Sequence, residues 1–371
     1  MDGYKYMAIV EWSKKYIASK NLHPNDRFLS ENELCSIHGV SRQTVRQALK
    51  CLEGDDIICR VRGSGTFVKK TQDTKLEKPA ALKSVGVIST YFSDYIFPQI
   101  VTGIESVLNK AGIAMQLAIT HNQVMEESEA LKTMIAIQDS SSTLDEQRIV
   151  EPSKSALPNP NMELYQEIKR NHMSLVFFNA KYSWADFPYT AMNDELAGKI
   201  ATDYLFDCGH TRISGIFALD DIQGHKRYSG FMRSCIAHNV RSAEKNVLWF
   251  ATGDKSELYY YAQKKLMSII RDSTAIICYN DELAINFLRF CREHNIRVPE
   301  DISVIGIDDS KISVLCDVAL TTVRHPHQIL GETAAKMLIE QMNMPQKTIE
   351  DVIYTPELIV RDSVKKIVDN H

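Results

Sequence analysis

The residues best suited to chemistry in this sequence lie in the segment SRQTVRQALKCL, which starts at Ser41. Ser41 is a favoured N-cap residue, and the apolar residues after it recur at the spacing of one helical face. Arg42 and Arg46 are four residues apart, so they project together from the opposite face, with Gln43 and Thr44 beside them. Guanidinium and amide groups pair with guanine and adenine edges in the major groove of DNA. The segment therefore predicts a helix that reads duplex DNA.

A second basic element follows. The segments IICRV and TFVKK flank RGSG, where Gly63 and Gly65 permit the positive φ of a hairpin turn. Arg60 and Arg62 are expected on the tip or flank of this hairpin, where a two-stranded wing reaches the minor groove or the phosphate backbone. Lys5, near the start of the first helical pattern, is expected to meet a phosphate.

Composition and charge narrow the class of protein. The 371 residues predict two or three domains, and 44% hydrophobic and 24% charged residues are typical of a globular chain. Residues 1–75 carry 13 Lys and Arg against 9 Asp and Glu, a net charge of +4, whereas the remainder carries 30 against 38, a net charge of -8. Only the N-terminal part of the chain therefore has the positive net charge that favours binding to a polyanion.

The sequence also indicates a compartment. It contains no apolar run of membrane-spanning length and no secretory signal pattern at its start, so we expect a cytoplasmic protein without a membrane partner. The eight cysteines form no CxxC pair. This spacing favours reduced, buried thiols over disulfides or a metal site, and no cofactor is expected.

A second set of polar residues follows the apolar runs after residue 84. Runs such as VGVIST, SLVFF and TAIICY alternate with amphipathic segments, as in parallel sheets covered by helices. At least eight such units predict two doubly wound lobes. Open α/β sheets bind ligands at the carboxyl ends of their strands, and a sugar requires charged and amide groups together with an aromatic face. The candidate ligand-binding residues are Tyr91, Asp94, Tyr95, Phe97, Glu151, Lys154, Arg227, Asn280, Asp281, Asp308 and His325.

The predicted domain organisation has two parts. Residues 1–71 form a DNA-binding domain, in which Ser30 and Glu33 have capping-box spacing and Gly39 ends the helix. Residues 72–84 are polar, lack periodicity and are predicted to be a linker. Residues 85–371 form the two-lobed domain, and residues 138–148 interrupt its pattern as a loop.

The first part resembles a known family on the order of the motifs SENEL, HGVSRQTVRQAL and GSGTFV. These are similar to the winged helix-turn-helix domain of the GntR family. The resemblance implies that Glu31, Arg42, Gln43, Arg46 and Arg62 contact operator DNA.

The second part resembles the effector domain of the LacI/GalR repressors, which has the fold of periplasmic sugar-binding proteins. The similar segments are VGVISTYFSDYIFPQIVTGIE, CGHTRISGI, RYSGF, CYNDELA, VPEDISVIGIDDS and TPELIVRDS. The resemblance implies that Arg227, Asn280 and Asp308 bind hydroxyl groups and that Phe97 stacks on the ligand.

A GntR-type head on a LacI-type body resembles the arabinose repressors, on the segments YFSDYIFP and IVEPSKSAL. This implies a repressor that binds palindromic operator DNA as a homodimer and is released by a sugar inducer. L-Arabinose is the expected inducer, and another pentose or a hexose is the open alternative.

Two other classes of function fit the sequence less well. A cytoplasmic sugar-binding protein without DNA function fits the body but not the basic head. An enzyme is less favoured, because adjacent acids such as Asp220 and Asp221, or Asp308 and Asp309, point to opposite faces of a strand. The sequence contains no GxSxG, P-loop or GxGxxG motif, and the HPH triplet at 325–327 has no matching metal-ligand cluster. We therefore expect neither catalysis nor a metal.

Overall fold

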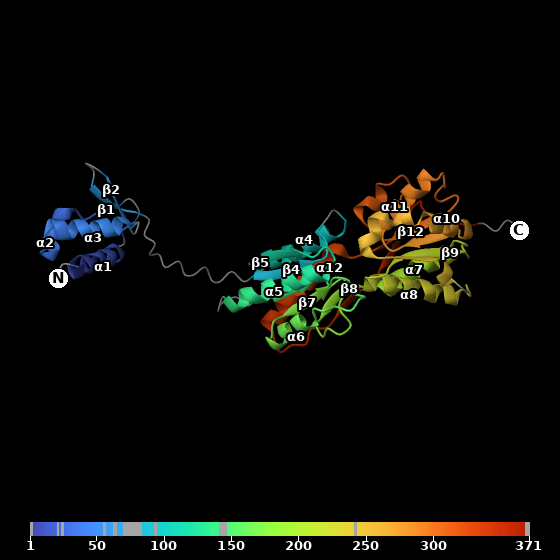
Figure 1. Ribbon diagram of the computed structural model, residues 1–371, viewed down its shortest axis with the longest axis horizontal. Helices are drawn as coiled ribbons and strands as arrows, with labels where there is room; N and C mark the ends of the chain where they lie inside the picture. Colours follow the sequence, from blue (N-terminus) through green and yellow to red (C-terminus); the bar gives the residue numbers. More distant parts are fainter. Residues whose placement is uncertain are drawn as a thin grey trace. The chain divides into compact units, whose positions relative to one another are not determined.

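The computed structural model describes residues 3–20, 22–23, 26–54, 57–61, 65–69, 84–92, 95–140, 147–240 and 243–367. The chain divides into two compact units, Met1–Ala81 and Leu82–His371 (Figure 1). Of the predicted linker, residues 72–84, only Ser84 lies inside the described part, and it begins the first strand of the second unit. Within the described residues, no helix is long and apolar enough to cross a membrane.

Helices and a small antiparallel sheet with strand order β1-β3-β2 form the N-terminal unit. Its elements are α1 (Gly3–Ser19), β1 (Arg27–Phe28), α2 (Glu31–His38), α3 (Arg42–Gly54), β2 (Ile58–Val61) and β3 (Gly65–Val68). The predicted capping box is present, since the Ser30 hydroxyl accepts from the Glu33 amide at 3.3 Å and the Glu33 carboxylate accepts from the Ser30 amide at 2.7 Å. Helix α2 ends at Gly39, whose φ of 61° is the left-handed conformation that favours glycine.

The core of this unit decides which face of α3 meets solvent. Val45, Ala48, Leu49 and Leu52 are fully buried, and they pack with apolar residues of α1, β2 and β3. Because these positions recur every three or four residues, the opposite face of α3 is exposed. The fold confirms the predicted winged helix-turn-helix.

The first lobe of the C-terminal unit is a parallel sheet of order β14-β8-β7-β6-β4-β5 between two layers of helices. Its strands are β4 (Ser84–Ser89), β5 (Ala114–Ile119), β6 (Gln147–Val150), β7 (Leu175–Phe178), β8 (Tyr189–Met192) and β14 (Val352–Tyr354). Its helices are α4 (Phe97–Lys110), α5 (Val124–Ser140), α6 (Met162–Arg170) and α12 (His327–Asn343). Helices α4 and α12 pack on one face of the sheet, and α5 and α6 pack on the other.

The structure corrects both ends of the segment predicted as a loop at residues 138–148. Its first three residues continue α5, and its last two begin β6, which is buried between β4 and β7. The local sequence QDSSSTLDEQR gives no apolar signal for the start of this strand. Pairing with the two neighbouring strands, rather than local composition, sets this boundary. Residues 141–146 lie outside the described part.

The second lobe has a sheet of order β10-β9-β11-β12-β13-β15, parallel except for β15. Its strands are β9 (Ile213–Ala218), β10 (Val247–Phe250), β11 (Ala275–Cys278), β12 (Ser303–Asp308), β13 (Thr321–Arg324) and β15 (Glu357–Ile359). Its helices are α7 (Asp194–Asp207), α8 (Ile222–Ala237), α9 (Leu258–Tyr261), α10 (Gln263–Asp272) and α11 (Asp281–Glu293), with short 3-10 turns at Ala243–Asn246, Thr252–Glu257 and Lys311–Val314. Helices α7 and α8 cover one face, and α9, α10 and α11 cover the other.

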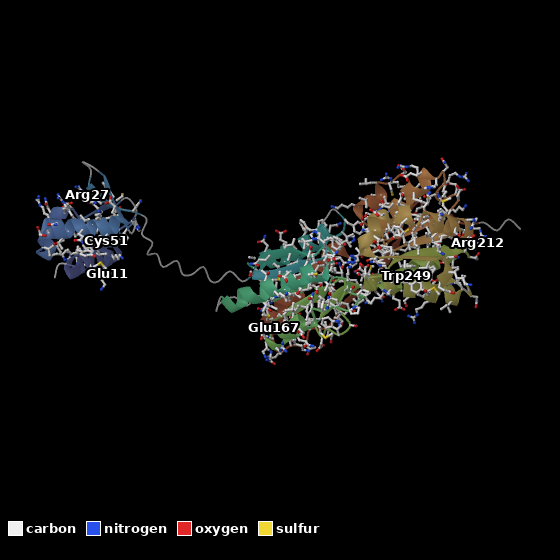
Figure 2. All side chains as sticks on the ribbon, viewed as in Figure 1. Glu11, Arg27, Cys51, Glu167, Arg212 and Trp249 are labelled. Carbon is white, nitrogen blue, oxygen red and sulfur yellow. The ribbon has the colours of Figure 1, made fainter. Side chains whose placement is uncertain are left out.

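The chain crosses between the lobes after β8, after β13 and after β14. In Figure 2, the labelled Glu167 of α6 lies on the first lobe, and Trp249 of β10 lies on the second. The two parallel sheets confirm the predicted doubly wound, two-lobed architecture. The carboxyl ends of their strands are where such sheets place ligands.

Candidate functional site

A cavity of about 350 Å³ lies between the two lobes. Eight of the predicted ligand-binding residues line it: Tyr91, Tyr95, Phe97, Glu151, Arg227, Asn280, Asp308 and His325. Its volume is in the range of small-molecule pockets. Most of the residues predicted from the strand-end rule, that open α/β sheets bind ligands at the carboxyl ends of their strands, therefore lie together, although they come from segments far apart in the sequence.

Arg227 organises the side of the cavity formed by the second lobe. Its Nε donates to Asp194 Oδ1 at 2.9 Å, Nη1 donates to the Tyr279 carbonyl oxygen at 2.6 Å, and Nη2 donates to Asp308 Oδ1 at 3.2 Å. Its guanidinium carbon lies 4.9 Å from the centroid of the Tyr279 ring. Burial alone would lower the pKa of Arg227, but the carboxylates of Asp308 and Asp194 outweigh it and raise the pKa above its usual value. Arg227 is therefore a fixed cation that orients Asp308.

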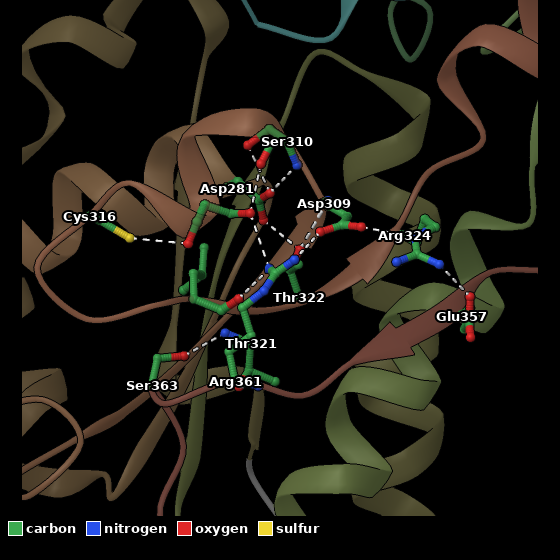
Figure 3. A network of polar contacts seen from close by, with 12 residues as sticks. Asp281, Asp309, Ser310, Cys316, Thr321, Thr322, Arg324, Glu357, Arg361 and Ser363 are labelled. Carbon is green, nitrogen blue, oxygen red and sulfur yellow. Dashed lines mark hydrogen bonds and ion pairs between the residues drawn. The ribbon is translucent and has the colours of Figure 1, made fainter.

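Asp308 occupies an unusual backbone conformation at the end of β12. Its φ is 120° and that of Asp309 is 49°, both in the region that non-glycine residues rarely adopt. Asp308 turns to the cavity, where Oδ2 accepts from the Tyr95 hydroxyl at 2.6 Å. Asp309 turns away and accepts from Arg324 Nε at 2.8 Å and from Arg361 Nη2 at 2.5 Å (Figure 3). The two carboxylates thus have separate partners, as expected for adjacent acids.

Asp281 does not line the cavity, contrary to the sequence prediction. Its Oδ2 accepts from the Ser310 amide at 2.7 Å and the Ser310 hydroxyl at 2.9 Å, and its Oδ1 accepts from the Thr322 hydroxyl at 2.5 Å (Figure 3). Burial and the nearby charge of Asp308 raise the pKa of Asp281 to about 7. Asp281 connects α11 to the turn after β12 and to β13. It therefore supports the fold around the cavity without lining it.

Lys154 also does not line the cavity. It has a φ of 45°, and its backbone amide donates to Asn122 Oδ1 at 2.6 Å. This turn sets the course of the loop after β6. Lys154 is connected to the cavity through its backbone, which contacts the cavity residue Asn122. Asp94, another predicted ligand, lies outside the described residues.

Glu151 forms the polar floor of the first lobe. Its Oε2 accepts from the Ser89 hydroxyl at 3.1 Å, the Thr90 amide at 2.8 Å and the Thr90 hydroxyl at 2.6 Å, and its Oε1 accepts from Asn179 Nδ2 at 2.6 Å. Burial raises the pKa of Glu151 even though these donors oppose the shift. Asn179 Oδ1 is buried and has no hydrogen-bond partner among the described residues. It is an acceptor available to a ligand hydroxyl.

Several cavity residues were not identified from the sequence. They are Asn122, Asn179, Asp221, Gln223, Thr252, Lys255, Tyr279 and Glu282. Burial, together with the charges of Asp220 and Glu151, raises the pKa of Asp221 to about 7. Asp221 follows the apolar run RISGIFA, so the strand-end rule that selected Asn280 and Asp308 also applies to it. The other residues come from turns and helix faces that leave no comparable signal.

Aromatic rings supply apolar surface on both sides of the cavity. Tyr91 and Phe97 come from the first lobe, with ring centroids 5.5 Å apart, and Phe250 and Tyr279 come from the second, 5.9 Å apart. The pKa of His325 is lowered well below its usual value by burial, so its imidazole is neutral. Its Nδ1 is buried without a hydrogen-bond partner in the described part of the chain. The cavity thus offers neutral and charged polar groups beside aromatic faces.

The candidate DNA-binding face lies on α3. Arg42, Gln43 and Arg46 are exposed. Thr44 is half-buried, and its hydroxyl lies 2.9 Å from the hydroxyl of Ser41, so it takes part in the helix cap. Of the predicted contacts on α3, Arg42, Gln43 and Arg46 therefore lie on the side opposite the core, and Thr44 does not.

An acidic residue holds two of the predicted arginines in place. Arg46 Nε donates to Glu31 Oε2 at 3.0 Å, and Arg60 Nη1 lies 3.9 Å from Glu31 Oε1. Arg60 also donates to Glu53 through Nη2 at 2.6 Å. Glu31 therefore links α3 to the first strand of the wing. Gly65 has a φ of 126° at the start of the second wing strand, as the hairpin prediction requires. Arg62, Gly63 and the side chain of Lys5 lie outside the described part.

No group of three or more His, Cys, Asp and Glu side chains is placed to hold a metal among the described residues.

Residues 6–68 match the family described as bacterial regulatory proteins, gntR family, and residues 202–364 match a periplasmic binding protein-like domain. These matches fit the resemblances noted in the sequence.

Two relatives match nearly the full chain. An arabinose metabolism transcriptional repressor of Geobacillus stearothermophilus is 39% identical over 98% of this chain and 98% of its own length. A repressor of the same name from Halalkalibacterium halodurans is 36% identical over 97% of this chain and 96% of its own. The crystal structure of the transcription regulator CcpA of Lactococcus lactis superimposes with a TM-score of 0.66 at 23% identity, covering 76% of this chain and 99% of that one.

Proposed function

The chain belongs to the family of arabinose metabolism transcriptional repressors, and on this basis we propose that it is an operator-binding repressor released by L-arabinose. The observation that carries the proposal is the composition of the cavity between the lobes. Carboxylates, amides and a buried guanidinium converge there on a space flanked by aromatic rings. Such groups bind the hydroxyls and the C–H face of a monosaccharide.

The charge of the cavity supports a neutral sugar. Arg227 and Lys255 are its cations, and the carboxylates of Glu151, Asp221, Glu282 and Asp308 line the same space. Arg227 already donates to two carboxylates and a carbonyl group. An additional phosphate or carboxylate on the ligand would be repelled by the remaining acids, whereas neutral hydroxyls can both donate and accept.

The exposed face of α3 supports binding in a major groove, with the β2–β3 wing beside it. Arg42 and Gln43 are exposed and have no core role, and Arg46 on the same face donates to Glu31. A two-fold dimer would present two such helices to half-sites about 34 Å, or a multiple of this distance, apart, so a palindromic operator is expected.

An apolar surface on the second lobe supports a homodimer. Ile312, Val314 and Leu315 are exposed in the segment after β12, and 79% of Leu315 is accessible. Directly after them, Cys316 and Val318 line a groove together with apolar residues such as Ile285 and Ile296 and with three arginines, Arg289, Arg292 and Arg297. Burying this surface against a second copy would remove it from water.

Induction follows from the two-lobed architecture. A sugar bound in the cavity contacts both lobes, so it favours their closed arrangement. The rotation of the lobes changes the spacing of the two DNA-binding heads in the dimer, and operator affinity falls. Bound sugar then lowers the affinity for operator, and bound operator lowers the affinity for sugar by the same factor, typically about 5- to 150-fold.

Thermal unfolding with a panel of sugars, combined with operator binding, tests this function. A ligand at about a hundred times its Kd stabilises the folded protein by about 2.7 kcal/mol. We expect L-arabinose to give the largest stabilisation and to release a palindromic operator duplex. A larger effect of another pentose or hexose would replace L-arabinose as the inducer. Failure to bind any duplex at low ionic strength would overturn the repressor assignment.

A further inference from the structure

Helix α8 begins without a cap from its own residues. Asp221 occupies the N-cap position, but its side chain forms no capping hydrogen bond. Its carboxylate instead lies in the cavity, 3.5 Å from Asn122 Nδ2 and 3.4 Å from the Tyr279 hydroxyl. The first amide of the helix, that of Ile222, donates to the hydroxyl of Ser155 at 3.0 Å. Ser155 belongs to the loop after β6, in the opposite lobe.

A second hydrogen bond joins the same loop to the same helix start. The Ala156 amide donates to the Asp220 carbonyl oxygen at 3.2 Å. The Asp220 carboxylate accepts from the Thr252 amide at 3.0 Å and from its hydroxyl at 2.7 Å. Thr252 lines the cavity. The loop from the first lobe therefore contacts the turn that supports both Asp221 and Thr252.

The loop is held firmly by its own lobe. Glu127, which is fully buried, accepts from the Ser153 amide at 2.6 Å, from the Tyr182 hydroxyl at 2.8 Å and from Asn161 Nδ2 at 3.3 Å. The Ser153 hydroxyl lies 2.7 Å from that of Thr120. With these anchors on both sides, Ser155 is a fixed acceptor on the first lobe rather than a freely moving side chain.

We propose that Ser155 is a positioning residue that caps α8 from the opposite lobe and latches the closed cleft. The first amides of a helix have no partner within the helix, so each needs an external acceptor. When the lobes close, Ser155 supplies one, and when they open the amide of Ile222 loses it. Because α8 carries Arg227, closure and the placement of this arginine, which orients Asp308, are coupled. The identity of the sugar that drives closure rests on the proposed function, whereas the latch itself does not.

Amide hydrogen exchange in the full-length, sugar-free protein tests the latch directly. An uncapped first-turn amide exchanges rapidly, whereas a bonded one is protected. We expect the closed arrangement that the sugar-free wild type samples to protect the Ile222 amide in part, and this amide to exchange roughly 2- to 30-fold faster in Ser155→Ala, the range that corresponds to loss of one N-cap. Ser155→Thr retains the acceptor and should restore protection. Ser268→Ala is the matched control, because in the described part of the chain this hydroxyl bonds to Arg271 and Asp272 of its own helix, α10.

Sugar binding provides a readout that a merely local role of Ser155 would not change. Calorimetry with L-arabinose is expected to give a Kd weakened about fivefold in Ser155→Ala, with the sugar-free affinity for operator unchanged. Equal Ile222 exchange in the wild type and Ser155→Ala, or an equal L-arabinose Kd in both, would overturn the latch. A wild type that does not bind L-arabinose would instead count against the proposed inducer, and the exchange of Ile222 would still decide the latch.

Discussion

The hydroxyl of Tyr95 donates to Oδ2 of Asp308 at 2.6 Å, and this bond joins the two lobes at the cavity. The same hydroxyl accepts from the Asp281 amide at 3.1 Å. Because Asp308 Oδ1 accepts from Arg227, one carboxylate connects the arginine of α8 to the first lobe. The closed arrangement and the geometry of the ligand site therefore depend on the same group.

Tyr95→Phe is expected to weaken L-arabinose binding by roughly ten- to a hundredfold, since hydrogen bonds to charged groups contribute about 1.5–3 kcal/mol. The variant keeps the ring and removes only the hydroxyl. It therefore destabilises the closed arrangement, in which this hydroxyl bonds to Asp308. Isothermal titration calorimetry measures it. Tyr260→Phe is the control because 85% of Tyr260 is exposed. Equal affinities of the two variants would refute the role of the Tyr95 bond.

Asp221→Asn is expected to raise stability in a pH-dependent manner. The pKa of Asp221 is about 7 in the folded protein, against about 3.9 for an aspartate in an unfolded chain. The folded state therefore retains a proton that the unfolded state releases, and the wild type loses stability as pH rises from about 4 to about 7. The gain in Tm of the variant should grow across this window and level off above it. Thermal unfolding at a series of pH values measures the gain.

Asp281 provides the contrast to Asp221. Its pKa is also about 7, but its carboxylate accepts from Ser310 and Thr322. Asp281→Asn places an amide donor against these donors, so we expect a lower Tm than the wild type. The deficit should narrow as pH rises from about 4 to about 7, because wild-type Asp281 also retains a proton that the unfolded chain releases. A loss for Asp281→Asn beside a gain for Asp221→Asn would separate support of the fold from exposure to the cavity. A gain in Tm for both variants would contradict this distinction.

Arg42→Ala is expected to cost about 1–3 kcal/mol of operator affinity if the guanidinium reads a base. The loss should be smaller on a duplex of unrelated sequence, because non-specific binding depends on total charge. Fluorescence anisotropy with both duplexes at one salt concentration measures the two losses. Arg271→Ala, an exposed arginine of α10, is the control for net charge. An equal loss on both duplexes would assign Arg42 to the phosphate backbone instead.

Gly39→Ala is expected to destabilise the N-terminal unit by about 1 kcal/mol, because a left-handed φ penalises a side chain. A methyl group at Gly39 meets no atom within 4 Å, so the cost comes from the φ of 61° and not from a clash. Gly54→Ala is the matched control, since it has the same open surroundings without a positive φ. Hydrogen exchange of α2 amides in the full chain compares the two variants, and faster exchange in Gly54→Ala would argue against the backbone explanation.

If the proposed dimer forms through the surface around Leu315, Leu315→Glu is expected to convert it into monomers, because a charge in an apolar interface is costly to bury. Analytical ultracentrifugation over a range of protein concentrations measures the change. Met267→Glu, on the exposed side of α10, is the control, with 40% of Met267 accessible. A dimer that persists in Leu315→Glu would place the interface elsewhere on the chain.

Local sequence signals identified much of the fold. Ser30, Glu33 and Gly39 marked the ends of α2 because caps use short-range hydrogen bonds and local backbone angles. The spacing of apolar residues revealed the buried face of α3 for the same reason. The start of β6 at Gln147 was missed, since its pairing partners come from distant parts of the chain.

The strand-end pattern of the sequence by itself determined that a polar site lies between two lobes, because the carboxyl ends of parallel strands share one edge of a sheet. Only the tertiary structure decided which acids face the cavity. Asp308 enters it and Asp281 does not, because the first meets Tyr95, 213 residues away, and the second meets Ser310 and Thr322. Such choices depend on the packing of distant segments, which no local pattern encodes.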